Sequence, residues 1–296
     1  MEHLFLPLLW RGPGWGLMIL TTINQFTEIV PTAVGVDNFA DLKPYTESAE
    51  LWLKTNVLGK DLFATIDGEA FADEDLRKLC RNVIANHAYW DAIPFLDVVH
   101  TNSGFAVISG NNKVPASKER VERLREQCII RRDNEVENLI SFLEQTAAYH
   151  DEWKGSPTYS VLSDCLIQTA RELELYANWN GTRKDFLKLR PKLIQETISK
   201  IEPVFSRDYI EELIEKQRDN DVSADDSRVL VLLKQALGCI IDGNQNIAEA
   251  IAADALRYID ANEAQFATYF ASSEFAARNT PGYTNETDSP IFSSIY

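Results

Sequence analysis

The chain has 296 residues, of which 45% are hydrophobic and 10% are aromatic. This composition is typical of a folded protein rather than of a disordered chain, and the length allows two domains with buried cores. The formal net charge is −16, and both halves of the chain share it. Because a nucleic-acid-binding domain needs clustered cations to displace counterions, we expect no specific nucleic-acid partner.

Residues 1–17 differ from the rest of the chain. The apolar stretch Leu4–Trp10 is interrupted by Pro7, and it follows Glu2 rather than a lysine or an arginine. A secretory signal carries the opposite charge and a small-residue cleavage site, and the stretch is too short to span a membrane. We therefore expect either an upstream extension, with Met18 as the natural start, or a hydrophobic docking arm, and we expect no membrane partner.

A first helical unit is expected over residues 18–154. After a short helix or turn, Pro44 suits the first turn of a helix, because proline lacks the amide hydrogen that would have no partner there. That helix is expected to end near Leu58, since Gly59 is a typical residue at a helix C-terminus. A shorter segment through Ile66 follows.

Two long helices complete the first unit. Asp73–Asp75 place negative charge at the start of one helix, where the helix dipole favours it, and Pro94 is expected to end that helix. Ser117 is expected to cap the other helix, which the apolar spacing predicts from Lys118 to Tyr149.

Residues 95–114, between these two helices, depart from the helical pattern. Two β-branched or aromatic runs, Asp97–His100 and Phe105–Ile108, are separated by the turn signal Thr101–Gly104, which predicts a β-hairpin. An insertion in one unit is a place where function is often added. Its candidate residues for contact with a partner are Phe95, Val98, Val99, Phe105, Val107 and Ile108.

The stretch Lys154–Pro157 is the best candidate domain boundary, because glycine, serine and proline interrupt the helical pattern there. A second unit is expected over residues 155–277. Its predicted helices cover residues 159–179, 187–202, 208–218, 224–241 and 245–272. Pro203 is expected to break the second of these helices from the third.

A C-terminal arm is predicted over residues 278–296. The part before Pro290 is polar and irregular, which is typical of a tether. The last six residues are apolar again, and the candidate docking side chains are Ile291, Phe292, Ile295 and Tyr296. We expect this arm to become ordered on another chain.

The order of elements in the second unit repeats that of the first, and this is the most informative feature of the sequence. The paired segments are Asp41–Pro44 with Lys188–Pro191, Gly59–Ile66 with Ser206–Leu213, Ala72–Asp75 with Ala224–Ser227, and Asp133–Leu143 with Asp260–Phe270. The identity is low, but the apolar spacing agrees. The pattern indicates a diverged tandem duplication, and such units usually serve assembly or binding.

The sequence lacks the common catalytic motifs. There is no dinucleotide-binding or phosphate-binding glycine loop, no nucleophile elbow, no H-E-x-x-H and no Glu-x-x-His pair. We therefore expect no catalytic residues, no metal site, no cofactor and no enzyme activity. The four cysteines, Cys80, Cys128, Cys165 and Cys239, lie in predicted helices without a C-x-x-C pair, which predicts buried free thiols in a reducing compartment.

Two acidic clusters leave an alternative open. Asp73–Asp75 and the group Asp219, Asp221, Asp225 and Asp226 are of the type that binds Mg²⁺ and pyrophosphate in all-helical enzymes such as isoprenoid synthases, where the aspartates face one cavity. The competing interpretation is that both clusters begin helices in corresponding positions, where negative charge is favourable. The repeat correspondence favours the second interpretation.

Other charged groups are expected to have structural roles. The dense basic run between Lys118 and Arg132 is interleaved with acids at helical spacing, which predicts ion pairs on a solvated helix face rather than DNA binding. His87 and Asp91 are too few for a metal site, so a surface pair or a hydrogen bond at the core edge is expected. His150 is expected to complement a helix C-terminus.

The first unit resembles proteins of tailed phages. The segments that carry the resemblance are Asp41–Pro44, Leu58–Leu62, Ala92–Val98, Gly104–Val107 and Pro115–Val121. They resemble an uncharacterised family of similar length in Bacteroidales phages and prophages, over most of the chain. More loosely, one helical unit resembles the head–tail connector (adaptor) proteins, which form rings beneath the portal and have one such unit where this chain has two. The resemblance implies no catalytic residues.

These observations predict an all-α protein of two related helical-bundle units with one β-hairpin. The resemblance implies a virion structural protein of the neck, made in the bacterial host cytoplasm and found in the virion. Its partners would be further copies of itself in a ring-like homo-oligomer and virion proteins such as the portal or the tail adaptor. One alternative is the aspartate-rich enzyme. The other is a non-viral helical scaffold or adaptor, and the genomic neighbourhood of the gene would distinguish that scaffold from a connector.

Overall fold

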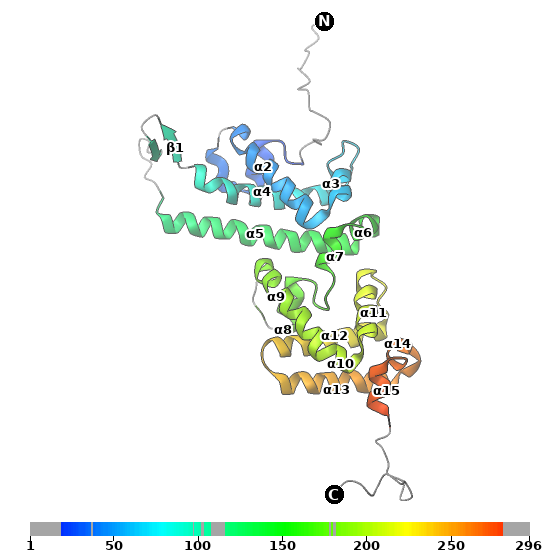
Figure 1. The fold of residues 1–296 in the computed structure, drawn as a ribbon. Helices are drawn as coiled ribbons and strands as arrows, with labels where there is room; N and C mark the ends of the chain where they lie inside the picture. The colour runs from blue at the N-terminus through cyan, green and yellow to red at the C-terminus, as the bar shows by residue number, and fades with distance from the viewer. Residues whose placement is uncertain are drawn as a thin grey trace, which may run out of the picture. The chain divides into compact units, whose positions relative to one another are not determined.

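The computed structural model describes residues 19–36, 38–96, 98–101, 104–107, 116–177, 179 and 182–280, with the backbone alone for residues 98–101, 104–107, 157, 161 and 162. The described chain is all-α apart from one short strand pair (Figure 1). The chain divides into two compact units. The first unit contains Met1–Asp164, Thr169–Arg171 and Gly181–Phe186. The second unit contains Cys165–Gln168, Glu172–Asn180 and Leu187–Tyr296. The first division thus falls after residue 164, not after residue 154. None of the described helices is both long and apolar enough to span a bilayer.

The first unit begins with five short elements. They are α1 (Ile23–Ile29), the 3₁₀-helix η1 (Pro31–Gly35), α2 (Phe39–Leu53), the π-helical turn η2 (Lys54–Leu58) and α3 (Lys60–Ile66). The Asn38 side chain accepts a hydrogen bond from the Ala40 amide and so begins α2. Pro44 therefore lies inside the helix, not in its first turn as expected. Gly59 ends the helical run with φ of 79°, as the sequence predicts.

Two long helices, a strand pair and two short helices follow. They are α4 (Glu74–Leu96), β1 (Val98–Thr101), β2 (Gly104–Val107), α5 (Lys118–Gln145), α6 (Ala147–Lys154) and α7 (Pro157–Leu162). Pro94 does not end α4, which continues through Leu96. The helix predicted to run to Tyr149 ends at Gln145 instead, because Thr146 adopts an extended conformation and begins α6. Ser117 is the N-cap residue of α5, but its hydroxyl makes no capping bond.

The core of the first unit forms where α4 packs against α2 on one side and α5 on the other. Its fully buried side chains include Leu53, Val83 and Leu139. The π-helical turn is tied to α6, because the Trp153 indole donates a 2.7 Å hydrogen bond to the Val57 carbonyl. This bond satisfies a carbonyl that the regular helical ladder no longer pairs.

Ten helical elements are described in the second unit, and the helices predicted over residues 208–218 and 224–241 are found at nearly the same bounds. The ten elements are α8 (Ala170–Ala177), α9 (Arg183–Glu196), the π-helical turn η3 (Thr197–Ile201), α10 (Glu202–Phe205), α11 (Arg207–Arg218), α12 (Ala224–Ile241), α13 (Gln245–Ala261), the 3₁₀-helix η4 (Glu263–Gln265), α14 (Ala267–Phe270) and α15 (Ser273–Asn279). The helix expected over residues 159–179 is interrupted at residues 163–169, and the one expected over residues 245–272 is interrupted at Asn262. Pro203 lies inside α10, and the break comes at Ser206, with φ of 69°.

The second core lies between α12 and α13 and continues into an aromatic cluster. The rings of Tyr209, Phe266 and Tyr269 are buried and contact one another edge-on or tilted. Arg278 stacks on the Tyr269 ring and belongs to α15, so the predicted arm cannot begin at that residue.

Candidate interaction surfaces

The candidate contact residues of the strand region are only partly described. Phe95, at the end of α4, is 62% exposed and stacks on Tyr45 with ring centroids 5.9 Å apart. Val98, Val99, Phe105 and Val107 lie in the two strands, with Val98 paired to Val107 and His100 to Phe105, but their side chains are not described. The remaining candidates, Ile108, Ile291, Phe292, Ile295 and Tyr296, lie outside the described residues.

The strand pair has only its own two strands among the described residues. β1 and β2 form a two-stranded antiparallel sheet, and among the described residues neither strand has a second partner. Each outer edge therefore carries backbone N–H and C=O groups that another strand could pair with. Two strands alone are marginally stable in water, so this element is suited to binding a further strand or surface.

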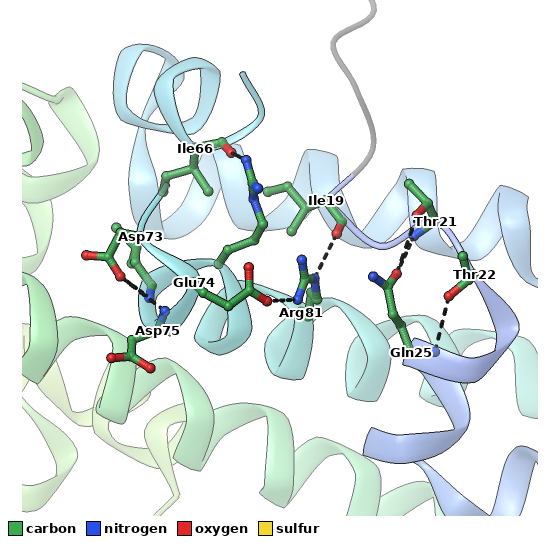
Figure 2. Close-up of polar contacts among 11 residues, drawn as sticks. Ile19, Thr21, Thr22, Gln25, Ile66, Asp73, Glu74, Asp75 and Arg81 are labelled. Carbon is green, nitrogen blue, oxygen red and sulfur yellow. Dashed lines mark hydrogen bonds and ion pairs between the residues drawn. The ribbon is translucent and has the colours of Figure 1, made fainter. Parts of the chain in front are cut away.

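A polar groove of about 670 Å³ between α1, α4 and α5 was not predicted from the sequence. Its wall is fixed by Arg81, which donates through Nε to the Ile19 carbonyl over 3.1 Å and pairs with Glu74 (Figure 2). Gln25 accepts a 3.1 Å hydrogen bond from the Thr21 amide beside it (Figure 2). These contacts join the described start of the chain to the first turns of α4.

The groove carries a mixture of charges. Glu135 accepts a 3.3 Å hydrogen bond from Asn82, which holds it within the wall. Lys78 and Arg131 are exposed, and neither forms an ion pair within the part of the chain that the structure describes. The lining can therefore accept a polar, partly anionic segment, but it has little apolar surface for tight binding.

Glu50 on α2 also holds the described start of the chain. Its Oε1 accepts a 2.8 Å hydrogen bond from the Ile19 amide. Burial raises the pKa of Glu50 from 4.5 to about 7, and hydrogen bonds from the Ile19 and Leu20 amides only partly oppose this shift. This contact depends on tertiary folding, and nothing in the local sequence signals it.

Of the two roles expected for His87, the structure shows a hydrogen-bond contact at the core edge, with Arg132, and not a surface pair with Asp91. The His87 ring is buried between Trp52 and Trp90, with centroid distances of 4.7 and 5.6 Å, and its Nδ1 lies 3.4 Å from Nη1 of Arg132. Burial, together with the Arg132 charge, lowers the pKa of His87 to about 4, so the ring is neutral at pH 7. Arg132 also stacks on Trp52, so the basic run on α5 contributes to packing and is not wholly a solvated face.

Each acidic cluster lies in its own unit. Asp73–Asp75, Asp225 and Asp226 lie at helix starts, whereas Asp219 ends α11 and Asp221 lies in the loop before α12. Asp73 accepts hydrogen bonds of 3.1 Å from the amides of Asp75 and Leu76 at the start of α4. In the second unit, Ser223 accepts a 3.0 Å bond from the Asp226 amide, and Asp226 pairs with Lys216 over 3.1 Å. The described residues include no group of three or more His, Cys, Asp or Glu side chains placed to hold a metal ion.

Three of the four cysteines are buried free thiols, as the sequence predicts. All four are free thiols, and Cys80, Cys128 and Cys165 are buried, whereas Cys239 is only partly buried. Burial raises the pKa of Cys80 to about 12 and that of Cys128 to about 11, so both stay protonated. His150 lies within α6, not at the end of a long helix, 3.7 Å from Asp151.

An exposed apolar stripe on α9 and η3 was also missed. It consists of Leu187, Pro191, Ile194 and Ile198 at spacings of i, i+4, i+7 and i+11, which place them on one side of a helix. Leu187 is 44% exposed and Ile198 is 55% exposed, Pro191 is also exposed and Ile194 is half-buried, while Phe186 and Leu193 fill the buried side of the same helix. We call these four residues the α9 stripe. The spacing is visible in the sequence, but only a helix over residues 187–202 was predicted there, without considering that this helix has two apolar sides.

The fold and these surfaces define an all-helical protein of two units with exposed apolar residues on its helices. Comparison with known families shows which family the chain belongs to. The chain belongs to the Family of unknown function (DUF6712), whose sequence profile matches residues 30–162 and 212–279. No curated protein and no solved structure matches the chain.

Proposed function

We propose that this protein is a virion structural protein of a tailed phage or prophage, a connector in the neck that acts through contacts between subunits. The assignment to phages rests on the sequence resemblance of the first unit. The observation that carries a role in assembly is the strand pair β1–β2, whose outer edges have no partner strand among the described residues. The nearby exposed ring of Phe95 adds apolar surface to the same region.

The strand pair provides the first test. Strand addition or apolar insertion by a neighbouring subunit would satisfy the open backbone groups. Deleting Asp97–Asn112 should leave the helical circular dichroism signal unchanged, because α4 and α5 pack through their own apolar sides. The same deletion should abolish rings or higher oligomers in negative-stain images and in sedimentation velocity.

A matched control is the deletion of the same segment combined with a short glycine–serine linker, which restores the connection between α4 and α5 but not the strands. It should assemble no better than the deletion itself. Assembly at wild-type strength by either variant would contradict the proposed role of the strand pair. A protein that forms no oligomer before any deletion would contradict the connector function itself.

We also propose that the two units arose by tandem duplication, which suits a protein built from assembly modules. Pro44 lies inside α2 and Pro191 inside α9, and a π-helical turn follows each helix, although η2 begins ten residues after Pro44 and η3 begins six residues after Pro191. Gly59 follows η2 directly and Ser206 follows α10, and both have positive φ. These two residues are as far apart in sequence as the two prolines, which supports a common origin.

Burial and packing support the same origin. The buried side chains after the positive-φ residue occupy matching positions in the two units: Leu62, Phe63 and Ile66 in α3, and Tyr209, Ile210 and Leu213 in α11. The contact of α3 with α6 in the first unit corresponds to the contact of α11 with α14 in the second. Likewise, the contact of η2 with α7 corresponds to the contact of α10 with α15. Helices α12 and α13 lack a strand pair between them. A different helix order or handedness on superposition of residues 41–150 with 185–272 would refute the duplication.

A further inference from the structure

The α9 stripe lies in an unusually basic part of an acidic protein. Between residues 187 and 201 the chain carries Lys188, Arg190, Lys192 and Lys200 against the single acid Glu196, whereas the whole chain has a net charge of −16. Lys188 and Lys192 are exposed, and helical spacing places them along one side of the stripe. Lys192 and Lys200 form no ion pair with any residue that the structure describes.

The sequence contains a segment of complementary chemistry. Residues 281–296 carry the acids Glu286 and Asp288 and no lysine or arginine. Four apolar side chains follow the acids, at Ile291, Phe292, Ile295 and Tyr296. A segment with acids first and apolar groups after them matches a surface of lysines beside an apolar stripe.

We propose that the α9 stripe is the docking surface for the C-terminal segment 281–296 of a neighbouring copy of this chain. The apolar side chains of that segment cover the α9 stripe, and Glu286 and Asp288 lie against Lys188 and Lys192. This inference rests on the proposed assembly function and names the surface that receives the arm. A contact between two different surfaces can pass from one subunit to the next and close a ring.

Two other occupants fit less well. A second α9 stripe would bring lysines of both copies together, and like charges at an interface oppose association. An anionic membrane surface would attract the same lysines, but the acidic charge of the whole chain opposes that attraction. The C-terminal segment satisfies both the apolar and the charged part of the surface.

The experiment measures self-association of the full-length chain by sedimentation equilibrium at low salt. Leu187→Asp combined with Ile198→Asp should weaken association by about tenfold or more, because both side chains would be buried at the contact. Leu51→Asp is the matched control, since Leu51 is 60% exposed on α2 in the first unit. It should leave association unchanged, and all variants should keep the helical circular dichroism signal because these side chains are exposed.

A charge exchange tests the pairing itself. Lys188→Glu with Lys192→Glu should weaken association about tenfold, and adding Glu286→Lys with Asp288→Lys should restore most of it. Failure of the exchange to restore association overturns the pairing of arm and stripe. A full-length chain that is monomeric at about 100 μM overturns docking between copies.

The outcomes separate this inference from the proposed function. If removal of residues 281–296 abolishes association while both stripe variants associate normally, the arm assembles the protein on another surface and the α9 stripe is not its receptor. If the stripe variants lose affinity for anionic vesicles but not for one another, the surface binds membranes and the inference is wrong. If the strand-pair deletion abolishes assembly while both stripe variants associate normally, the connector function stands and this inference is wrong.

Discussion

At the scale of single residues, Glu50 is the position where folding most clearly changes chemistry. Its carboxyl group is buried beside the Ile19 and Leu20 amides, with Asp67 and Glu47 close enough to disfavour its negative charge further. The pKa of about 7 in the folded state lies above the value of 4.5 for an exposed glutamate. The folded chain therefore binds this proton more tightly than the unfolded chain, and the free energy of unfolding falls as the pH rises from 4.5 to 7.

The variant Glu50→Gln tests this relation. Glutamine keeps an oxygen that accepts the Ile19 hydrogen bond but carries no charge, so at pH 8 it should be more stable than the wild type by about 1–3 kcal/mol. At pH 4.5 the two proteins should have similar stability. Urea unfolding at both pH values measures the difference. Glu47→Gln, whose residue lies on the same helix in a 3.8 Å pair with Lys43, should change stability by less than about 0.5 kcal/mol. Parallel pH profiles for wild type and Glu50→Gln would contradict the assignment.

Such residues could not be found from the sequence. The environments of Glu50 and His87 are made by residues distant in the chain, such as Ile19 and Arg132. By contrast, the negative charge of Asp73–Asp75 at the start of a helix was predicted, because a helix N-terminus favours it whatever the tertiary contacts are. Local rules thus identified the acidic residues that begin helices, but not the polar groove or the buried histidine.

At the scale of elements, the helical class and most helix positions followed from apolar periodicity, and the errors lie at the breaks. Proline was taken as a helix end at Pro94 and Pro203, yet both prolines lie within helices. The actual breaks occur at Thr146, Ser206 and Asn262, where the backbone leaves the helical region without a proline. Packing against other helices decides these breaks, and a single-sequence pattern does not contain that information.

Gly238 shows how packing constrains one such element. An added Cβ would lie 2.3 Å from the Tyr176 carbonyl oxygen and 2.9 Å from the Ala177 Cα, both backbone atoms of α8. Gly238→Ala should therefore lower the free energy of unfolding by about 1–3 kcal/mol, although alanine favours the helix itself. Gly155→Ala is the control, because its nearest neighbour would be 3.7 Å away and its φ is −68°. It should be neutral or stabilising by up to about 1 kcal/mol. Equal thermal stability of Gly238→Ala and the wild type would show that α8 can move away without cost.

At the scale of the whole molecule, the division into two units followed from the sequence, but its place did not. Lys154–Pro157 was predicted as the boundary on turn residues alone, whereas short stretches up to residue 186 alternate between the two compact units. The duplicated pattern remains a proposal, supported by the π-helical turns and the positive φ of Gly59 and Ser206. The α9 stripe could have been predicted from its spacing, had two apolar sides of one helix been considered.

The C-terminal segment gives the prediction that concerns the complete chain. Burying Ile291, Phe292, Ile295 and Tyr296 contributes about 4–8 kcal/mol to a contact, before the cost of ordering the preceding tether. Truncation after Thr280 should therefore weaken self-association by at least about tenfold. Because we expect residues 281–296 to become ordered on another chain rather than on their own subunit, the melting temperature of the monomer should change by less than about 2 °C.

Sedimentation equilibrium and differential scanning calorimetry on the same preparations measure the two effects separately. Thr284→Ala with Thr287→Ala is a matched control, since it alters the tether without removing a charge or a large apolar side chain, and it should associate normally. A fall of many degrees in the melting temperature of the truncated chain at a concentration where it is monomeric would mean that the segment packs on its own subunit. In that case the exposed α9 stripe would be covered within one chain, and contacts between copies would depend on the strand pair β1–β2.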